Sequence, residues 1–280
     1  MTRRFAVLGS PISHSKSPAI HLAAYRVLGL DWEYGRAEVS EGGLRKFIDE
    51  LDSDWDGFSV TMPLKDEATK FASIHDELST ITKATNTLFK NDEGIWEGSN
   101  TDIFGIVQAL REAGIQTPKR VLILGSGATA TSAMTAISEM SPKAEVRVWA
   151  RNAAAKRELI AFGKSLGLRV GAASNLKRAS IAAELTISTL PAGTMDDLAR
   201  TLSSSRFWSP RGALFDVAYN PWPSALANAW SQKNRTVVSG LEMLIWQAVA
   251  QIRIFFNGSP TQELPNEIAV VEAMRLATEN

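Results

Sequence analysis

Short apolar runs alternate with longer stretches of helical spacing along the first hundred residues. The apolar runs are residues 5–8, 32–34 and 57–60, and the helical stretches between them are residues 17–28 and 44–51. Parallel strands joined by helices give this rhythm. The pattern therefore predicts a βαβαβ unit with a mostly parallel sheet, followed by weaker strands at residues 87–89 and 95–96 and a helix at residues 103–112.

The rhythm restarts in the second half of the chain. Residues 120–124 have the pattern of a buried strand, a helical stretch runs to Met140, and residues 146–149 form the next apolar run. Three further strands are predicted at residues 185–188, 213–217 and 236–238, and two final helices at residues 240–256 and 266–277. Each half has its own series of strands and helices, so the best single boundary lies near residues 100–105.

Composition limits the classes of protein that this chain could be. Its 280 residues are enough for about two domains. Thirty basic side chains balance thirty acidic ones, which disfavours a general nucleic-acid binder. With no Cys and three His, the sequence predicts no disulfide and no metal site. We also expect no secretory leader, no membrane span and a cytoplasmic location, because the apolar stretches are short or interrupted by polar residues.

A glycine-rich turn follows the strand at residues 120–124. The residues Gly125, Gly127 and Ala130 form a GxGxxA pattern between a strand and a helix. In such a turn the first glycine allows the tight bend, the second admits a pyrophosphate, and the third small residue lets the helix pack closely on the strand. The free N–H groups of the helix would bind the phosphates. The pattern predicts a dinucleotide site, and a purely structural turn is the alternative.

The end of the following strand distinguishes between cofactors. An acidic residue about 20 residues after the glycines would bind the ribose 2′-hydroxyl of NAD. Here the sequence reads Ala150-Arg151-Asn152, with Lys156 and Arg157 close behind. Because an arginine can pair with a 2′-phosphate through two hydrogen bonds, this favours NADP. The alternative is that Arg151 is an ordinary solvated loop residue.

Four short polar motifs stand out in the first half: Ser13-His14-Ser15-Lys16-Ser17-Pro18, Ser59-Val60-Thr61-Met62-Pro63-Leu64-Lys65, Ala84-Thr85-Asn86-Thr87 and Gly98-Ser99-Asn100-Thr101-Asp102. Ligands of open α/β sheets bind beyond the carboxyl ends of the strands, where two of these motifs are expected. Each motif also has a structural alternative: Ser17 and Asp102 could cap helices, Lys65 could be a surface lysine and Asn86 a turn former.

These motifs resemble those of the shikimate dehydrogenase family, and the similarity covers nearly the whole chain. It continues through Asp216-Val-Ala-Tyr219 and Gly240-Leu-Glu-Met-Leu-Ile-Trp-Gln247. The resemblance implies an α/β protein of two domains, a mixed-sheet substrate domain and a Rossmann-type NADP-binding domain. The expected bounds are residues 1–103 plus about 240–280 for the substrate domain and 104–239 for the NADP domain, with the C-terminal helices returning to the first domain and the active site in the cleft between the two.

The resemblance also implies an activity, the NADPH-dependent reduction of 3-dehydroshikimate to shikimate on the route to chorismate and the aromatic amino acids. Lys65 is the expected proton carrier, and Asp102 orients its ammonium and the substrate. Ser15, Ser17 and the Tyr219 hydroxyl would hold the substrate carboxylate. Three more side chains would bind the ring hydroxyls together with Lys65 and Asp102: Thr61, Asn86 and Gln247.

The cofactor residues that the resemblance implies are Gly125, Ser126, Gly127, Ala128, Thr129, Ala130, Arg151, Asn152, Thr189, Leu190, Val217, Gly240 and Met243. Two segments depart from the family pattern, because Ala155 replaces a second arginine and residues 188–191 read Ser-Thr-Leu-Pro. Alternatives are a quinate/shikimate dehydrogenase using NAD, an aminoshikimate dehydrogenase and a non-catalytic NADPH-binding regulator. The expected partner is a small-molecule substrate, with no nucleic acid or membrane, in a monomer or homodimer.

Overall fold

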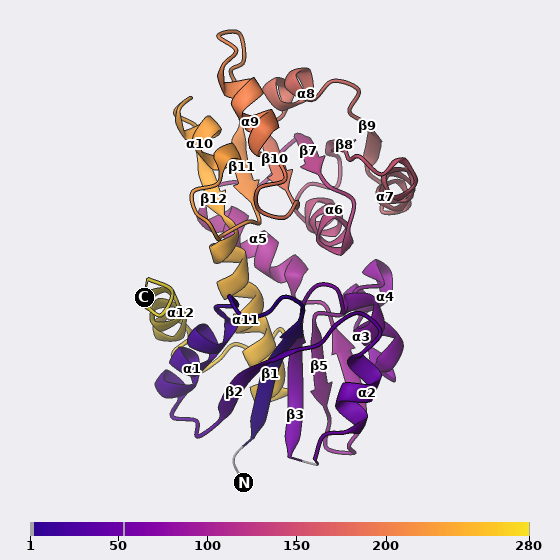
Figure 1. Cartoon of the computed structure of the whole chain (residues 1–280), viewed down its shortest axis with the longest axis vertical. Coiled ribbons are helices and arrows are strands. Elements are labelled where there is room, and N and C mark those ends of the chain that lie inside the picture. The colour runs from indigo at the N-terminus through magenta and orange to yellow at the C-terminus, as the bar shows by residue number, and fades with distance from the viewer. Residues whose placement is uncertain (1–2, 53, 280) are drawn as a thin grey trace. The chain divides into compact units, whose positions relative to one another are not determined.

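The chain divides into two compact units. The computed structural model describes residues 3–52 and 54–279, drawn in Figure 1. Unit 1 comprises Met1–Gly105 and Leu244–Asn280, and unit 2 comprises Ile106–Met243. The outermost residues of the predicted domains, 1, 2 and 280, lie outside the described part. Both units consist of a sheet with helices, so the α/β fold class is confirmed.

Unit 1 contains a six-stranded mixed sheet in the order β2-β1-β3-β5-β6-β4. Its strands are β1 (Arg4–Gly9), β2 (Glu33–Glu38), β3 (Trp55–Val60), β4 (Ile74–His75), β5 (Thr87–Lys90) and β6 (Trp96–Ser99). Strand β1 runs parallel to both β2 and β3, as the βαβαβ pattern predicts. Strand β5 is antiparallel to β3 and to β6, which makes the sheet mixed.

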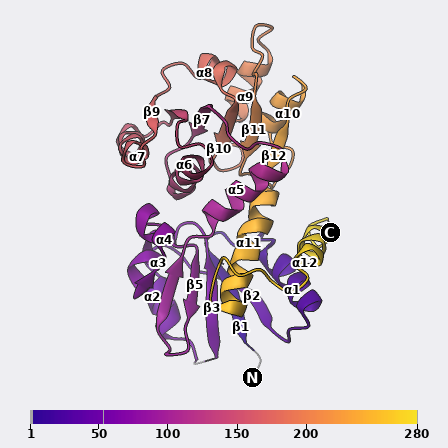
Figure 2. The same cartoon turned by 180° about the vertical axis from the view of Figure 1, so that it is seen from behind.

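The helices of unit 1 come from both ends of the chain. They are α1 (Ser17–Leu28), α2 (Leu44–Asp49), α3 (Lys65–Phe71), α4 (Glu77–Thr82) and α12 (Glu267–Leu276), with the first residues of α5 (Asp102–Glu112) and most of α11 (Gly240–Asn257). Helix α12 packs against α1, and the two lie side by side in Figures 1 and 2. The predicted return of the C-terminal helices to the first domain is therefore confirmed.

Alternation along the strands gives the sheet of unit 1 two different faces. Successive side chains of a strand point to opposite sides. Leu8 and Phe58 pack with Leu44 and Leu64 in an apolar cluster formed with α2 and α3. On the other face the Phe5 ring stacks on Phe255 of α11, with 4.4 Å between centroids. This second face also carries buried polar side chains from β3, β5 and α11.

Unit 2 contains a six-stranded sheet in the order β12-β11-β10-β7-β8-β9, and every pairing is parallel. The strands are β7 (Arg120–Leu124), β8 (Glu145–Trp149), β9 (Arg169–Ala172), β10 (Leu185–Ser188), β11 (Ala213–Asp216) and β12 (Val237–Ser239). This is the Rossmann strand order 3-2-1-4-5-6. Its helices are α6 (Ala128–Met140), α7 (Ala153–Ser165), α8 (Leu176–Ala182), α9 (Asp196–Ser203) and α10 (Ala225–Ser231).

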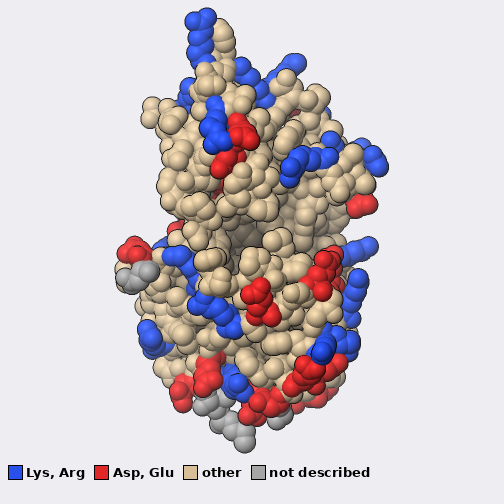
Figure 3. All heavy atoms as spheres, viewed as in Figure 1, with Lys and Arg blue, Asp and Glu red and all other residues tan. Residues whose placement is uncertain are grey.

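Basic and acidic side chains are mixed over the face shown in Figure 3, where no broad area carries a single sign. This agrees with the formal charge of zero. Within residues 3–52 and 54–279, no helix has the length and apolar character needed to cross a membrane.

His21 is a titratable side chain of unit 1 whose pKa burial shifts strongly. It is fully buried on α1, and its ring stacks on Tyr34 with 3.9 Å between centroids. Tyr25 and Phe255 lie next to it. Because burial removes water from the charged imidazolium, it lowers the pKa of His21 to about 3.

This burial predicts a pH dependence of stability. In the unfolded chain the imidazole titrates near 6.5, so between pH 6.5 and 3 the unfolded state binds a proton that the folded state does not. The free energy of unfolding should therefore fall as the pH is lowered through this window, by up to about 1.4 kcal/mol per pH unit. In His21→Phe, which cannot be protonated, the dependence should be weaker.

Urea denaturation of the wild type and His21→Phe at pH 7, 6 and 5 measures the difference. Burial raises the pKa of Asp76 and Asp216, and these carboxyls titrate alike in both proteins. An identical pH slope for the two proteins would contradict the assignment of a neutral, buried His21.

Candidate active site

Four loop segments of unit 1 meet at one edge of its sheet. Strands β1 and β3 end there, and the antiparallel register places Ser59 opposite Thr87 and Thr87 opposite Ser99. The start of β5 and the end of β6 therefore lie at the same edge as the end of β3. Through this register, motifs far apart in the sequence come together, as expected for a ligand site at strand ends.

Lys65 and Asp102 form a buried ion pair at this edge. The Lys65 Nζ donates a hydrogen bond to Asp102 Oδ2, and the two side chains are only 14% and 6% exposed. Lys65 is the first residue of α3 and Asp102 the first of α5. A carboxylate is favourable at a helix N-terminus and an ammonium is not, so the contact with Asp102 offsets the unfavourable position of Lys65. The surface-lysine alternative is therefore wrong.

Asn86 holds the second oxygen of Asp102. Its Nδ2 donates to Asp102 Oδ1 at 2.8 Å and to Thr101 Oγ1 at 2.9 Å. Its Oδ1 accepts hydrogen bonds from the Thr101 N–H at 2.9 Å and from Thr87 Oγ1 at 2.8 Å. Asn86 is 2% exposed, so these bonds replace water and fix the orientation of the amide.

Gln247 joins this group from α11. Its Oε1 lies 3.4 Å from Asn86 Nδ2, and its Nε2 donates to the Leu244 carbonyl at 2.8 Å. The structure thus brings together four of the predicted site residues, Lys65, Asn86, Asp102 and Gln247. Both Asn86 and Gln247 are buried, and the hydrogen bonds of the Asn86 side chain go to Thr87, Thr101 and Asp102 rather than to a turn of its own.

The serine motif follows β1 and borders the same edge. The Thr61 N–H donates to the Leu8 carbonyl at 2.9 Å, and the Ser10 N–H donates to the Met62 carbonyl at 3.1 Å. A Cβ at Gly9 would lie 2.5 Å from Thr61 Cγ2, so only glycine permits this close approach. The loop that carries the serines is therefore fixed to the loop between β3 and α3.

Ser15 and Ser17 are close to each other, since the Ser17 N–H donates to Ser15 Oγ at 3.3 Å. The cap position of α1 is Lys16, with no side-chain cap hydrogen bond, so the interpretation of Ser17 as the helix cap is wrong. The Lys16 Nζ donates to the carbonyl of Thr278, while His14 is exposed. The assignment of Ser15 and Ser17 to a ligand carboxylate remains a prediction.

The glycine turn of unit 2 has the geometry of a phosphate site. Gly125 has φ +118°, and a Cβ there would lie 2.3 Å from Thr189 Oγ1, so the fold requires glycine. Gly127 is the cap residue of α6 and lacks a side-chain cap bond. A Cβ at Gly127 would meet no atom within 4 Å, so packing does not explain this glycine. Open space beside an uncapped helix N-terminus fits a pyrophosphate.

The residues after β8 are exposed. Arg151 lies on the surface, directly before the N-terminus of α7. Asn152 caps that helix, accepting hydrogen bonds from the Ala154 and Ala155 N–H groups at 3.0 and 3.1 Å. No acidic residue occupies positions 150–152, so the structure leaves the tip of β8 suited to a 2′-phosphate.

Further predicted cofactor residues follow β10, β11 and β12 of unit 2. Thr189 Oγ1 donates to the Leu124 carbonyl at 2.9 Å, which ties its segment, with Leu190, to the glycine turn. A Cβ at Gly240 would lie 1.9 Å from the Val217 carbonyl oxygen, so the backbone approaches closely there. The remaining members of the predicted set are Ser126, Ala128, Thr129, Ala130 and Met243, of which Ala130 and Met243 are buried.

Tyr219 also belongs to unit 2, three residues after β11. Burial raises the pKa of its hydroxyl, so this group is a neutral donor near neutral pH. The predicted carboxylate donors Ser15 and Ser17 lie in unit 1. The contribution of Tyr219 to their site remains a prediction.

The predicted site residues do not include every side chain that contacts the site; Thr87 and Thr101 lie in the motifs without an assigned role, and Gln251 lies outside them. Thr87 and Thr101 bond to the Asn86 amide, and Gln251 bonds to the Asn86 carbonyl at 3.0 Å. A signal for Gln251 exists, because it lies four residues after Gln247 in a largely apolar helix. Residues spaced by four lie on one face of a helix.

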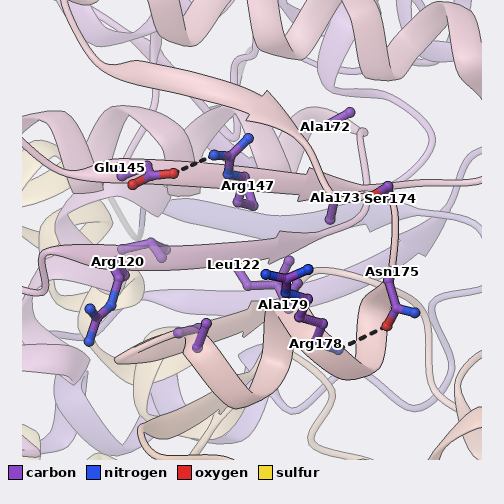
Figure 4. Close-up of a pocket in the computed structure, with 13 residues that line it drawn as sticks. Arg120, Leu122, Glu145, Arg147, Ala172, Ala173, Ser174, Asn175, Arg178 and Ala179 are labelled. Atoms are coloured by element: carbon purple, nitrogen blue, oxygen red, sulfur yellow. Dashed lines mark hydrogen bonds and ion pairs between the residues drawn. The ribbon is translucent and has the colours of Figure 1, made fainter.

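A separate pocket of about 390 Å³ lies on the sheet of unit 2 (Figure 4). It is lined by residues of β7, β8 and α8 and by the loop before α8. Two of its arginines pair with carboxylates of this chain, Arg147 with Glu145 at 2.5 Å and Arg120 with Glu184 at 3.1 Å. Its lining residues lie outside the Gly125–Ala130 turn, so this pocket is distinct from the candidate phosphate site.

Comparisons with known proteins agree with these features. Residues 7–88 match the family described as the shikimate dehydrogenase substrate binding domain. A shikimate dehydrogenase (NADP(+)) of Nitrosopumilus maritimus is 30% identical over 259 residues, covering 91% of this chain and 93% of that protein.

Solved structures extend the similarity to the complete fold. The shikimate dehydrogenase of Mycobacterium tuberculosis is 36% identical, with a TM-score of 0.84 over 98% of this chain and 99% of that one. The shikimate 5-dehydrogenase of Thermus thermophilus, solved with NADP(H) and shikimate, is 30% identical, with a TM-score of 0.80 over 99% of this chain and 100% of that one.

The two glycines of the turn should respond differently to substitution by alanine. Gly125→Ala introduces a strained positive φ and a contact with Thr189, and should lower the free energy of unfolding by about 1–3 kcal/mol. Gly127→Ala meets open space and should cost about 1 kcal/mol or less, because alanine is only a poorer cap. Urea denaturation measures both, and equal losses would contradict the different roles given to the two glycines.

Proposed function

The chain belongs to the shikimate dehydrogenase family, and we propose that it catalyses the reversible, NADPH-dependent reduction of 3-dehydroshikimate to shikimate. The observation that carries this proposal is the buried Lys65–Asp102 pair with Asn86 and Gln247 beside it. The glycine turn of unit 2 supports it, because its space fits a dinucleotide phosphate. The reaction belongs to the route that leads to chorismate and the aromatic amino acids.

Substrate binding falls to hydroxyl and amide groups of unit 1. We assign Ser15 and Ser17 to the substrate carboxylate, with the Tyr219 hydroxyl as a third donor. Thr61, Asn86 and Gln247 bind the ring hydroxyls. A site built to pair hydroxyls disfavours analogues that lack them, since its buried polar groups would stay unpaired. A charged clamp would bind the carboxylate of substrate and product equally tightly, which does not raise kcat. Neutral hydroxyl donors bind it more weakly.

Lys65 moves the proton. In the direction of reduction, its Nζ donates a proton to the oxygen of the ring ketone, which becomes the hydroxyl of shikimate. In the direction of oxidation, the neutral amine accepts that proton back. Lys65 is only 14% exposed, so bulk water has limited access to the group that transfers the proton.

Asp102 orients both partners of this transfer. One carboxylate oxygen accepts the Lys65 ammonium and the other accepts the Asn86 amide, so the carboxylate cannot rotate freely. A fixed carboxylate holds Lys65 Nζ in one direction and can accept a hydrogen bond from the substrate hydroxyl. Such positioning of reacting groups accounts for a large part of enzymatic rate enhancement.

The cofactor site is assigned to unit 2. NADPH, when bound, supplies the hydride that the ring carbon receives. Gly127 and the N-terminus of α6 would hold its pyrophosphate, and Arg151 would pair with its 2′-phosphate. We further propose a cytoplasmic protein that acts as a monomer or homodimer; the absence of Cys suits a reducing compartment.

The proposed function is tested by initial rates at 340 nm with the purified protein. Shikimate and quinate are each combined with NADP⁺ and NAD⁺. Rapid turnover only with shikimate and NADP⁺ is the expected result. A preference for quinate or NAD⁺ would indicate a quinate/shikimate dehydrogenase. Absence of turnover in all four combinations would favour an aminoshikimate dehydrogenase or a non-catalytic regulator.

Replacing the proton carrier should abolish most of the activity. Lys65→Ala removes the group that transfers the proton and should lower turnover about 100-fold or more. The matched control is Lys70→Ala on the same helix, because Lys70 is exposed and lies outside the site. It should keep normal turnover. Near-normal turnover of a folded Lys65→Ala protein would remove Lys65 from the mechanism.

Replacing Arg151 should change cofactor preference. Arg151→Ala should raise the KM for NADPH far more than the KM for NADH, because only NADPH carries the 2′-phosphate. Arg169→Ala is the matched control, since Arg169 pairs in register with Glu145, at the opposite end of β8 from Arg151. If Arg151→Ala raised both KM values equally, Arg151 would not recognise the 2′-phosphate.

A further inference from the structure

We propose that Gln251 is a positioning residue for the reaction, acting through Asn86 on the Asp102 carboxylate. This proposal rests on the proposed function and adds a residue behind the site that does not itself contact the substrate. Gln251 lies on α11, one helical turn after Gln247, and is 1% exposed. All residues of the argument belong to unit 1.

The Gln251 side chain makes three hydrogen bonds, to Ser59 of β3, to Thr87 of β5 and to Asn86, the residue before β5. Its Nε2 donates to the Asn86 carbonyl and to Thr87 Oγ1, each at 3.0 Å. Its Oε1 accepts the Ser59 hydroxyl at 2.7 Å, and Ser59 accepts the Tyr34 hydroxyl at 2.5 Å. One amide therefore joins the Asn86 carbonyl and Thr87, directly after Asn86 Cα, to a helix that begins more than 150 residues later.

A series of hydrogen bonds runs from Gln251 through Thr87 and Asn86 to Asp102. Thr87 Oγ1 accepts from Gln251, so its own proton is free to reach Asn86 Oδ1 at 2.8 Å. Asn86 Oδ1 is then an acceptor, and its Nδ2 is left to donate to Asp102 Oδ1. Each hydroxyl accepts once and donates once along the series, and the carboxylate is the final acceptor.

Two donors fix which end of the Asn86 amide faces the carboxylate. Asn86 Oδ1 accepts from the Thr101 N–H at 2.9 Å and from Thr87 Oγ1 at 2.8 Å, so loss of the Thr87 hydroxyl leaves the amide held by one donor instead of two. Gln251 keeps the second donor in place by holding the Thr87 hydroxyl and the Asn86 backbone together. A buried hydrogen-bond network in which every donor and acceptor has a partner holds its side chains in one conformation.

The test compares Gln251→Met with the wild type. Methionine has a similar volume but lacks the amide, while the Asn86 carbonyl keeps its hydrogen bond from the Val60 N–H at 2.7 Å. We expect kcat for shikimate oxidation to fall about 10- to 100-fold, because misplaced reacting groups lose this much. The KM for NADP⁺ should stay within about twofold, since the variant leaves the glycine turn of unit 2 unchanged.

Two further variants separate positioning from general loss of stability. Ile252→Ala, at the next and fully buried position of α11, leaves a cavity without touching the network. It should lower the unfolding temperature but keep kcat. Thr87→Val should lose kcat as Gln251→Met does, and Thr87→Ser, which keeps the hydroxyl, should retain it. If Gln251→Met does not fold, the comparison of Thr87→Val with Thr87→Ser tests the same proposal.

A double-mutant cycle gives the decisive comparison. If Gln251 acts through Asn86, adding Gln251→Met to Asn86→Ala should change kcat by less than about twofold. A full additional loss in that background, a wild-type kcat for Gln251→Met, or an equal loss of kcat in Ile252→Ala would overturn the proposal while leaving the proposed function intact. A wild type without shikimate turnover would overturn both.

Discussion

A buried ion pair imposes the main constraint on unit 1. Removing two charges from water costs more than their attraction returns unless the remaining donors and acceptors are also satisfied. Asp102 meets this condition because α5 starts at it and Asn86 fills its second carboxylate oxygen, whereas Lys65, at the start of α3, depends on its contact with Asp102. The antiparallel placement of β5, the close approach of the β1 and β3 loops, and the polar face of α11 all serve to bring these groups to one sheet edge.

In unit 2 the proposed phosphate site is formed by the backbone of the glycine turn. The fold leaves no room for a side chain at Gly125. At Gly127 a side chain would fit, but glycine stands there and the space stays open. The first glycine makes the turn and the second leaves space for a phosphate. The proposed function assigns proton transfer to the buried pair of unit 1 and phosphate binding to the turn of unit 2.

Much of this could be predicted from the sequence. Helix α1 has its predicted bounds, since Pro18 favours its start and Gly29, with φ +66°, ends it. The short edge strand β9 has little apolar pattern and was not predicted, nor were helices α7 and α8 on either side of it. Lys65 and Asp102 are found within motifs. The contact of Gln251 with Asn86 spans 165 residues, and it depends on the antiparallel register of β5, which no local pattern specifies.

In the proposed mechanism a fixed, charged Asp102 directs the proton transfer of Lys65. The variant Asp102→Asn, which keeps the size of the side chain and removes its charge, tests this through kcat for shikimate oxidation. We expect a loss of about 100-fold or more in a protein with native circular dichroism, because a neutral amide oxygen holds the ammonium more weakly than a carboxylate does. A kcat within a few-fold of the wild type would contradict it.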